Sequence, residues 1–219
     1  MDIFSGLWLA DYVGSFLNSG GNGLYFFHYL PLEMEHGCND SAGTFGMQTV
    51  DRDYKIQQPL AQFFVAQLIN LEWIQPGSAE HRSFSARSDI DDGAGHALVT
   101  AYAVKRPDGA WSLLLVNRDQ QNTHSVKIAF QNAEQAVQTF IGPVEISTFG
   151  KSQYQWHPGH TRPAGHAEQP GQPFVVEDTK GMADPDGPIL HSQQTVGKDT
   201  NFDLPAASVV VVRGKIGTR

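Results

Sequence analysis

The chain has 219 residues, of which 40% are hydrophobic and 17% are charged, and its formal net charge is −8. This length allows one large or two modest domains, and the acidic balance argues against a nucleic-acid partner or an anionic-membrane partner. The single cysteine, Cys38, excludes a disulfide bond within the chain.

Residues 2–17 are largely apolar, but two aspartates interrupt them and no basic segment precedes them. We therefore expect neither a signal peptide nor a membrane span. The sequence predicts a soluble protein, and any export signal lies outside these 219 residues.

The first predicted element is a helix over residues 2–18, with Asp2 as its N-cap and Ser19, Gly20 and Gly21 as its stop. Its apolar positions cover more than half of its circumference, which predicts a heavily buried helix. The run LYFFHYL that follows, at residues 24–30, is almost unbroken in its apolar and aromatic character. Such a run predicts a strand over residues 23–30 that is covered on both faces.

A loop, a short strand near TFGMQTV and a turn at DRD are expected next. A second helix is predicted to begin at Pro59 and to end before Pro76 and Gly77. The order of helix, strand and helix indicates a partial α/β unit over residues 1–77.

Beyond residue 80 the pattern becomes typical of β-structure. Pro107, Asp108 and Gly109 separate two apolar runs, which predicts a hairpin. Further strands are expected near HSVKIAF, AVQTFI, VEISTFG, PFVVED and ASVVVVRG. Short strands with turn signals between them predict an antiparallel β-sandwich over residues 78–219, and residues 150–200 are expected to form long loops on it.

The order and texture of these elements resemble the C-terminal portion of retaining (β/α)8-barrel glycoside hydrolases of the β-xylosidase and α-L-arabinofuranosidase type. DIFSGLWLADYVGSFLN resembles the seventh barrel helix, NGLYFFHYLP the eighth strand, and DLPAASVVVVRG the closing strand of the C-terminal sandwich. In such enzymes the catalytic carboxylates follow the fourth and seventh strands, so the resemblance implies that both positions precede Met1. It also implies a carbohydrate ligand.

Glycoside hydrolysis needs two carboxyl groups, separated by about 5–5.5 Å for retention or by about 6.5–9.5 Å for inversion. The candidate catalytic pair is Glu33 and Glu35, which in an extended chain point to one side at roughly 6–7 Å. A solvated acidic loop is the alternative interpretation of the same residues. Asp51 and Asp53 share this spacing, but DRD is more typical of a turn.

Flat aromatic side chains bind sugars by stacking on the apolar faces of pyranose rings. Tyr25, Phe27 and Tyr29 share one face of the predicted strand, and His28 is expected near the sugar. Trp156 is the tryptophan that we expect to be exposed, because it lies in the polar segment YQWHPGH. Further aromatic candidates, most of them expected in the core, are Trp8, Trp73, Trp111 and Tyr154.

Histidines in HPGHTRPAGH raise a metal site as an alternative, but their spacing matches no ligand motif, and we expect no metal and no cofactor. His36 and Cys38 could serve as soft ligands or as a Cys/His pair, although adjacency in sequence does not place a base beside a nucleophile. Motifs of serine hydrolases, nucleotide-binding proteins and zincins are absent.

The resemblance therefore implies a glycoside-hydrolase-like protein that acts on plant-type polysaccharides or oligosaccharides. Two alternatives stay open, namely a non-catalytic glycan-binding or accessory module and a glycosidase fragment without the usual carboxylates. A helix–strand–helix unit would leave apolar surface and strand edges uncovered, so we also expect a homo-oligomer.

Overall fold

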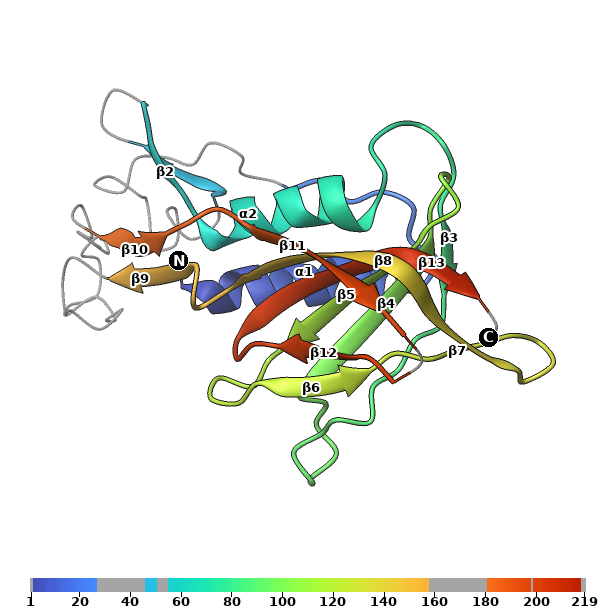
Figure 1. Ribbon diagram of the computed structural model, residues 1–219. Helices are drawn as coiled ribbons and strands as arrows, with labels where there is room; N and C mark the ends of the chain where they lie inside the picture. Colours follow the sequence, from blue (N-terminus) through green and yellow to red (C-terminus); the bar gives the residue numbers. More distant parts are fainter. Residues whose placement is uncertain (1, 27–45, 51–54, 158–180, 198, 218–219) are drawn as a thin grey trace.

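The computed structural model describes residues 2–26, 46–50, 55–157, 181–197 and 199–217 (Figure 1). Its helical part consists of α1 (Ile3–Asn18), α2 (Ala61–Leu68) and a π-helical segment, η1 (Ile69–Trp73), that continues α2. The strands of the described part are β1 (Gln48–Val50), β2 (Ile56–Pro59), β3 (Arg82–Phe84), β4 (Val99–Lys105), β5 (Trp111–Asn117), β6 (His124–Lys127), β7 (Phe130–Gln131), β8 (Val137–Gly150), β9 (Tyr154–His157), β10 (Met182–Asp186), β11 (Leu190–Val196), β12 (Asn201–Leu204) and β13 (Ser208–Gly217).

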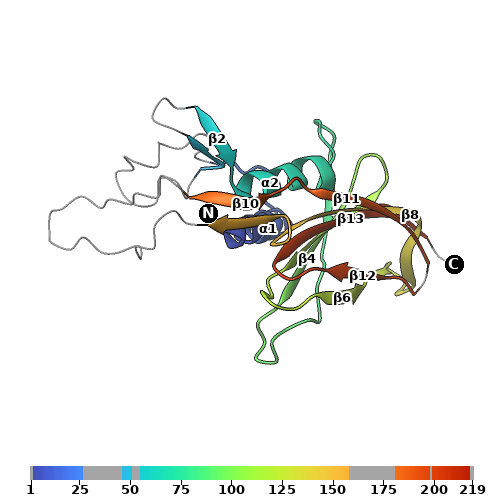
Figure 2. The ribbon, with the colours of Figure 1, turned by 60° about the vertical axis from the view of Figure 1, so that its left-hand side comes forward.

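A seven-stranded antiparallel sheet forms the centre of the molecule. Its strands lie in the order β11-β8-β13-β5-β4-β3, and β7 pairs with one end of β8. The helices cover one face of this sheet, and the β6–β12 pair lies across the other face, so the fold has three layers (Figures 1 and 2). The β9–β10 pair extends beyond one end of the sheet, near the N-terminus (Figure 2).

The two central strands, β5 and β13, are apolar on both faces. Leu114 and Val211 point toward the helices, whereas Leu113 and Val212 belong to the core on the opposite face. Side chains alternate along a strand, so a strand between two apolar layers is apolar at successive positions. This accounts for the unbroken apolar runs LLLV and VVVV, which follow the buried Ser112 and Ser208.

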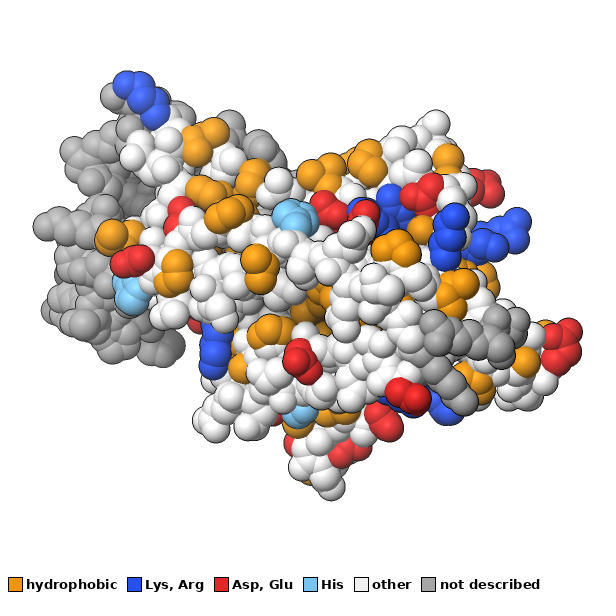
Figure 3. All heavy atoms as spheres, in the orientation of Figure 1, with side chains coloured by type: hydrophobic (Ala, Val, Ile, Leu, Met, Phe, Trp, Pro, Cys, Tyr) orange, Lys and Arg blue, Asp and Glu red, His pale blue; other side chains and the backbone are white. Residues whose placement is uncertain are grey.

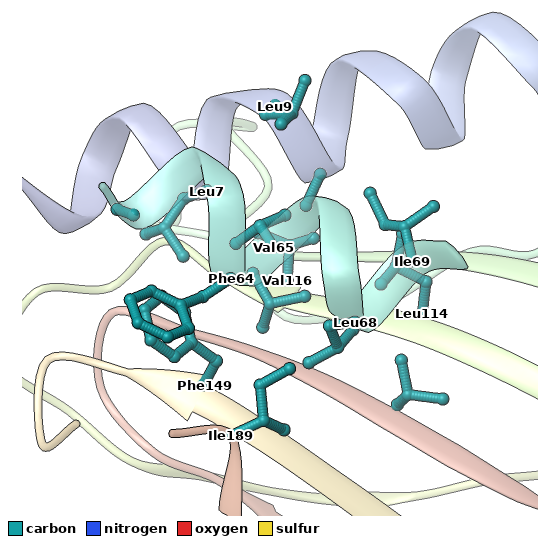
Figure 4. Close-up of a cluster of buried hydrophobic side chains, with 14 of the residues drawn as sticks. Leu7, Leu9, Phe64, Val65, Leu68, Ile69, Leu114, Val116, Phe149 and Ile189 are labelled. Carbon is teal, nitrogen blue, oxygen red and sulfur yellow. The ribbon is translucent and has the colours of Figure 1, made fainter. Parts of the chain in front are cut away.

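The helical layer packs tightly on the sheet (Figure 4). Phe64 of α2 stacks on Phe149 of β8 with ring centroids 4.9 Å apart, and Leu68 is fully buried beside them. The two helices approach closely at Gly6, where an added Cβ would lie 3.2 Å from the carbonyl oxygen of Ala61. Helices and sheet therefore share one hydrophobic core.

Two predicted elements are confirmed in detail. The α1 helix begins after Asp2, whose carboxylate accepts the backbone N–H of Phe4 at 3.0 Å, and it ends at Asn18. The hairpin predicted around Pro107 is the β4–β5 pair, and Gly109 at its turn has φ +83°.

The second helix was predicted to begin at Pro59, and this is wrong by two residues. Pro59 ends β2, and the Leu60 backbone N–H donates to the Met47 carbonyl oxygen at 2.8 Å. Because that bond holds Leu60 in an extended conformation, the helix begins at Ala61.

The β-rich character is confirmed, but the α/β unit is not. Residues 23–26, the described part of the strand predicted over 23–30, have no regular secondary structure. Both helices pack on an antiparallel sheet instead. Residues 150–200 were expected to be loops, yet β9, β10 and β11 lie there. The segments DRD and PFVVED lie outside the described residues.

Candidate functional site

The α1 helix carries aromatic side chains at every fourth position, namely Phe4, Trp8, Tyr12 and Phe16, and we call this set the aromatic face. Residues four apart lie on the same side of a helix. Trp8 is 63% exposed, Tyr12 48% and Phe4 37%, whereas Phe16 is half-buried. The helix buries its small and aliphatic side against the sheet and presents aromatic rings on the other.

Three rings of the aromatic face, those of Trp8, Tyr12 and Phe16, lie nearly parallel. The centroids of Trp8 and Tyr12 are 5.2 Å apart with an interplanar angle of 8°. Tyr12 and Phe16 follow at 6.5 Å and 19°. Stacking restrains each side chain, so the rings form an ordered apolar strip along the helix.

A polar border adjoins this strip on the side of β4 and β5. Asp11 of α1 accepts hydrogen bonds at Oδ1 from the Tyr102 hydroxyl, at 2.9 Å, and from the Thr100 hydroxyl. Its Oδ2 lies 3.4 Å from the Arg118 guanidinium, which also donates to the Ala97 carbonyl oxygen. We refer to Asp11, Thr100, Tyr102 and Arg118 as the polar border.

Gly14 permits this arrangement. An added Cβ at Gly14 would lie 2.3 Å from a carbon of the Tyr102 ring, far inside van der Waals contact. The Tyr102 ring therefore occupies space that any other residue at position 14 would fill. From there its hydroxyl reaches Asp11, one helical turn away.

Burial, together with the nearby Asp11 carboxylate, raises the pKa of Tyr102 to about 12. The hydroxyl consequently stays protonated at neutral pH and donates its hydrogen to Asp11. The Asp11 side chain is 19% exposed and that of Arg118 is 43% exposed. The polar border thus presents both a hydrogen-bond acceptor and a set of donors to solvent beside a flat apolar surface.

Of the predicted site residues, Tyr25 and Trp156 belong to the described part of the chain. The catalytic candidates Glu33 and Glu35 lie outside the described residues, as do Phe27, His28 and Tyr29. Tyr25 is described, and its side chain is 95% exposed in a segment without regular structure. Phe27 and Tyr29, which were predicted to share a strand face with Tyr25, are outside the described residues.

Trp156 was predicted to be an exposed loop residue, and this is wrong. It lies in β9, pairs with Ala183 of β10 and packs half-buried against the helical core. Polar residues flank Trp156 in the sequence, whereas β9 turns its side chain toward apolar neighbours. Trp73 and Tyr154 are buried, as expected.

Trp8 belonged to the aromatic candidates expected mostly in the core, and Tyr12 was not a candidate, yet both side chains are exposed. The signal was present, because aromatic residues recur every four positions while the helix buries Ile3, Leu7, Ala10 and Gly14. The prediction of a heavily buried helix did not anticipate that this row faces solvent.

Across the described ranges, no group of three or more His, Cys, Asp and Glu side chains is arranged to hold a metal ion. None of the described helices combines the length and the apolar character that a membrane span requires.

Comparison with known proteins supports the fold. No protein-family model and no curated protein matches the sequence. Among solved structures, the α-L-arabinofuranosidase from Thermotoga maritima in complex with arabinose is 11% identical and superposes with a TM-score of 0.52, covering 97% of this chain and 38% of that one. The catalytic domain of GH30 xylanase C from Talaromyces cellulolyticus is 14% identical, with a TM-score of 0.44 over 82% of this chain and 29% of that one. The GH51 arabinofuranosidase from Xanthomonas axonopodis pv. citri is 17% identical, with a TM-score of 0.43 over 78% and 29%.

The arabinofuranosidase comparison shows that this chain has a glycoside-hydrolase-like fold. The chain spans well under half of that enzyme, at 38% of its length.

Proposed function

We propose that this chain is carbohydrate-active and that the aromatic face of α1, with its polar border, binds a glycan. The observation that carries the proposal is the exposed, parallel pair of Trp8 and Tyr12 beside the fixed carboxylate of Asp11. Sugars offer apolar ring faces rimmed by hydroxyl groups, so a flat aromatic surface next to donors and acceptors matches both features.

The charge of the site favours a neutral glycan. Arg118 is already paired with Asp11, so this pair offers no uncompensated positive charge to a sulfate or a carboxylate ligand. The net charge of −8 also disfavours polyanions. The proposed ligand is a plant-type polysaccharide that is arabinose-bearing or β-linked, and the structural neighbour from Thermotoga maritima, which was solved with arabinose, supports the arabinose-bearing form.

Binding to soluble arabinoxylan, arabinan and xylan, measured by affinity electrophoresis and by calorimetry, tests this proposal. Trp8→Ala and Tyr12→Ala should each weaken binding by about tenfold, because an aromatic contact contributes about 0.5–1.5 kcal/mol beyond its area and 1.4 kcal/mol is a factor of ten. Leu71→Ala is the matched control, since Leu71 is also 48% exposed but lies on η1. Wild-type affinity in both aromatic variants would exclude the aromatic face as the binding site.

Hydrolysis of glycosidic bonds is the second candidate function, and the glycoside-hydrolase-like fold favours it. We propose Glu33 and Glu35 as the carboxyl pair, with His28 and Tyr29 beside the sugar. Hydrolysis of aryl glycosides and plant polysaccharides by the purified chain should then be abolished in Glu33→Gln and in Glu35→Gln, with unchanged circular dichroism. Full turnover in both variants would reject the assignment.

Measuring polysaccharide binding and glycoside hydrolysis on the same variants distinguishes the two candidate functions. A chain that binds polysaccharide through Trp8 but hydrolyses no glycoside is a glycan-binding or accessory module. Hydrolysis of small aryl glycosides that survives Trp8→Ala but not Glu33→Gln would place the chemistry away from α1, with the aromatic face holding the polymer.

A further inference from the structure

The two edges of the seven-stranded sheet differ in length and in charge. One edge is β3, which has three residues and begins with the exposed Arg82. The other edge is β11, whose seven residues, LHSQQTV, include no Asp, Glu, Lys, Arg, Pro or Gly. Proteins normally protect edge strands by keeping them short or by placing charges and prolines on them. Of the two edges, β11 lacks these protections.

The β11 strand is also regular and exposed. All seven residues pair in continuous antiparallel register with β8, from Leu190 opposite Thr148 to Val196 opposite Gly142. Six of the seven residues are exposed, and only Val196 is buried. Within the described residues, β8 is the sole strand that pairs with β11, so the other side of β11 presents unpaired backbone groups.

The surroundings of β11 are close to neutral. The one charged residue opposite it on β8 is Glu145, which is paired with Arg213 of β13. In the space-filling view, the Lys and Arg side chains gather mainly at the right-hand end, and the central band over β11 is largely uncharged (Figure 3). A chain with a net charge of −8 can therefore approach a second copy here without local repulsion.

From this edge we infer that two copies of the chain pair through β11, antiparallel around a two-fold axis, so that the two sheets become continuous. Full overlap of residues 190–196 places Gln193 opposite Gln193 of the second copy, and Ser192 opposite Gln194. Amide and hydroxyl groups carry both donors and acceptors, so an identical strand can satisfy them, which a charged residue could not.

The dimer should be weak. A pair of seven-residue strands buries less area than the roughly 1,200–2,000 Å² of a stable interface, so association should depend on concentration. Main-chain hydrogen bonds supply its affinity, as in other cases of strand addition. This inference does not depend on the proposed carbohydrate function.

Sedimentation velocity over a series from micromolar to submillimolar concentrations tests the inference. The wild-type mass should rise toward that of a dimer, whereas Gln193→Lys and Gln193→Glu should each stay monomeric, because like charges then face each other across the axis. An equimolar mixture of the two variants should regain the dimer, because opposite charges then pair. Gln121→Lys, an exposed substitution in the β5–β6 turn, is the matched control and should dimerise as the wild type does.

Three outcomes would overturn the inference: a wild-type monomer at every concentration, a dimer that persists in both Gln193 variants, or a dimer that Trp8→Ala abolishes while Gln193→Lys leaves it intact. The last outcome would place the interface on α1 instead. Hydrogen exchange provides a second readout, in which the amides of residues 190–196 should gain protection with concentration in the wild type and not in Gln193→Lys.

Discussion

Tyr102 of β4 donates its hydroxyl hydrogen to Asp11 of α1 across 2.9 Å, and this bond joins the helix that carries the aromatic face to the central sheet. Thr100 and Arg118 contact the same carboxylate. The orientation of α1, and with it the direction in which Trp8 and Tyr12 point, is therefore fixed by polar contacts as well as by the apolar core.

Removal of the Tyr102 hydroxyl should destabilise the fold. A hydrogen bond to a charged group contributes about 1.5–3 kcal/mol, so Tyr102→Phe should lower the free energy of unfolding by about that amount at pH 7. Urea denaturation measures it. Tyr12→Phe, which removes an exposed hydroxyl from the same helix, is the control and should change stability little.

The same residue predicts an alkaline pH dependence. The folded-state pKa of Tyr102 is raised from 10.0 to about 12, so its contribution is complete below pH 10 and is lost as pH rises toward 12, because the unfolded tyrosine ionises first. The stability difference between wild type and Tyr102→Phe should accordingly shrink over this interval. A constant difference up to pH 12 would contradict the assignment.

Substitution of Gly14 should disturb both packing and the site. The new methyl group of Gly14→Ala would overlap the Tyr102 ring, and overpacking of this kind costs about 1–3 kcal/mol, which exceeds the gain of about 1 kcal/mol in helix propensity. In the Tyr102→Ala background the same substitution should cease to destabilise, because the ring is gone. Ser15→Ala, at an exposed position of α1, is the control for the helix itself.

Arg106 should stabilise the C-terminal end of η1. Its guanidinium is buried and donates to the carbonyl oxygens of Glu72, at 2.7 Å, and Ile74, at 3.3 Å, where the helix ends. A cation at this position satisfies free carbonyls and interacts favourably with the helix dipole. Arg106→Met should lower the free energy of unfolding by about 1.5–3 kcal/mol, whereas Arg82→Met on the exposed β3 should not.

Acid should weaken the turn after β5. The Asp119 carboxylate accepts hydrogen bonds from the backbone N–H of Gln121 and from the side chain and backbone of Asn122. These bonds, that of Gln121 most of all, hold the pKa of Asp119 well below its usual range. A lowered folded-state pKa means that the contribution is present above the unfolded value of about 4 and is lost as pH falls below it. Thermal unfolding of the wild type should lose stability in that acidic range more steeply than Asp119→Asn. Asp203→Asn, an exposed carboxylate of β12, is the control and should behave as the wild type does.

Local patterns in the sequence predicted the elements whose ends and partners are close in the chain. Asp2 and the apolar periodicity after it located α1, and the turn residues 107–109 located the β4–β5 hairpin. In both, the capping residue or turn residue acts within a few positions of itself. The apolar run at 209–212 likewise indicated a buried strand, because a strand covered on both faces is apolar at successive positions.

Contacts with residues distant in the chain decide the strand at 190–196 and the exposure of the tryptophans. Residues 190–196 resemble a polar loop in composition, and they form a strand because β8, more than forty positions earlier, offers its edge. Trp156 is half-buried because the helical core lies beside β9, and Trp8 is exposed because the sheet packs on the other side of α1. Short-range sterics and hydrogen bonds specify the turns, the apolar strands and most of the helical boundaries, so local sequence patterns predict them. Which aromatic residues face solvent, and which strand lies at the edge of the sheet, depends on neighbours distant in the chain that no local pattern contains.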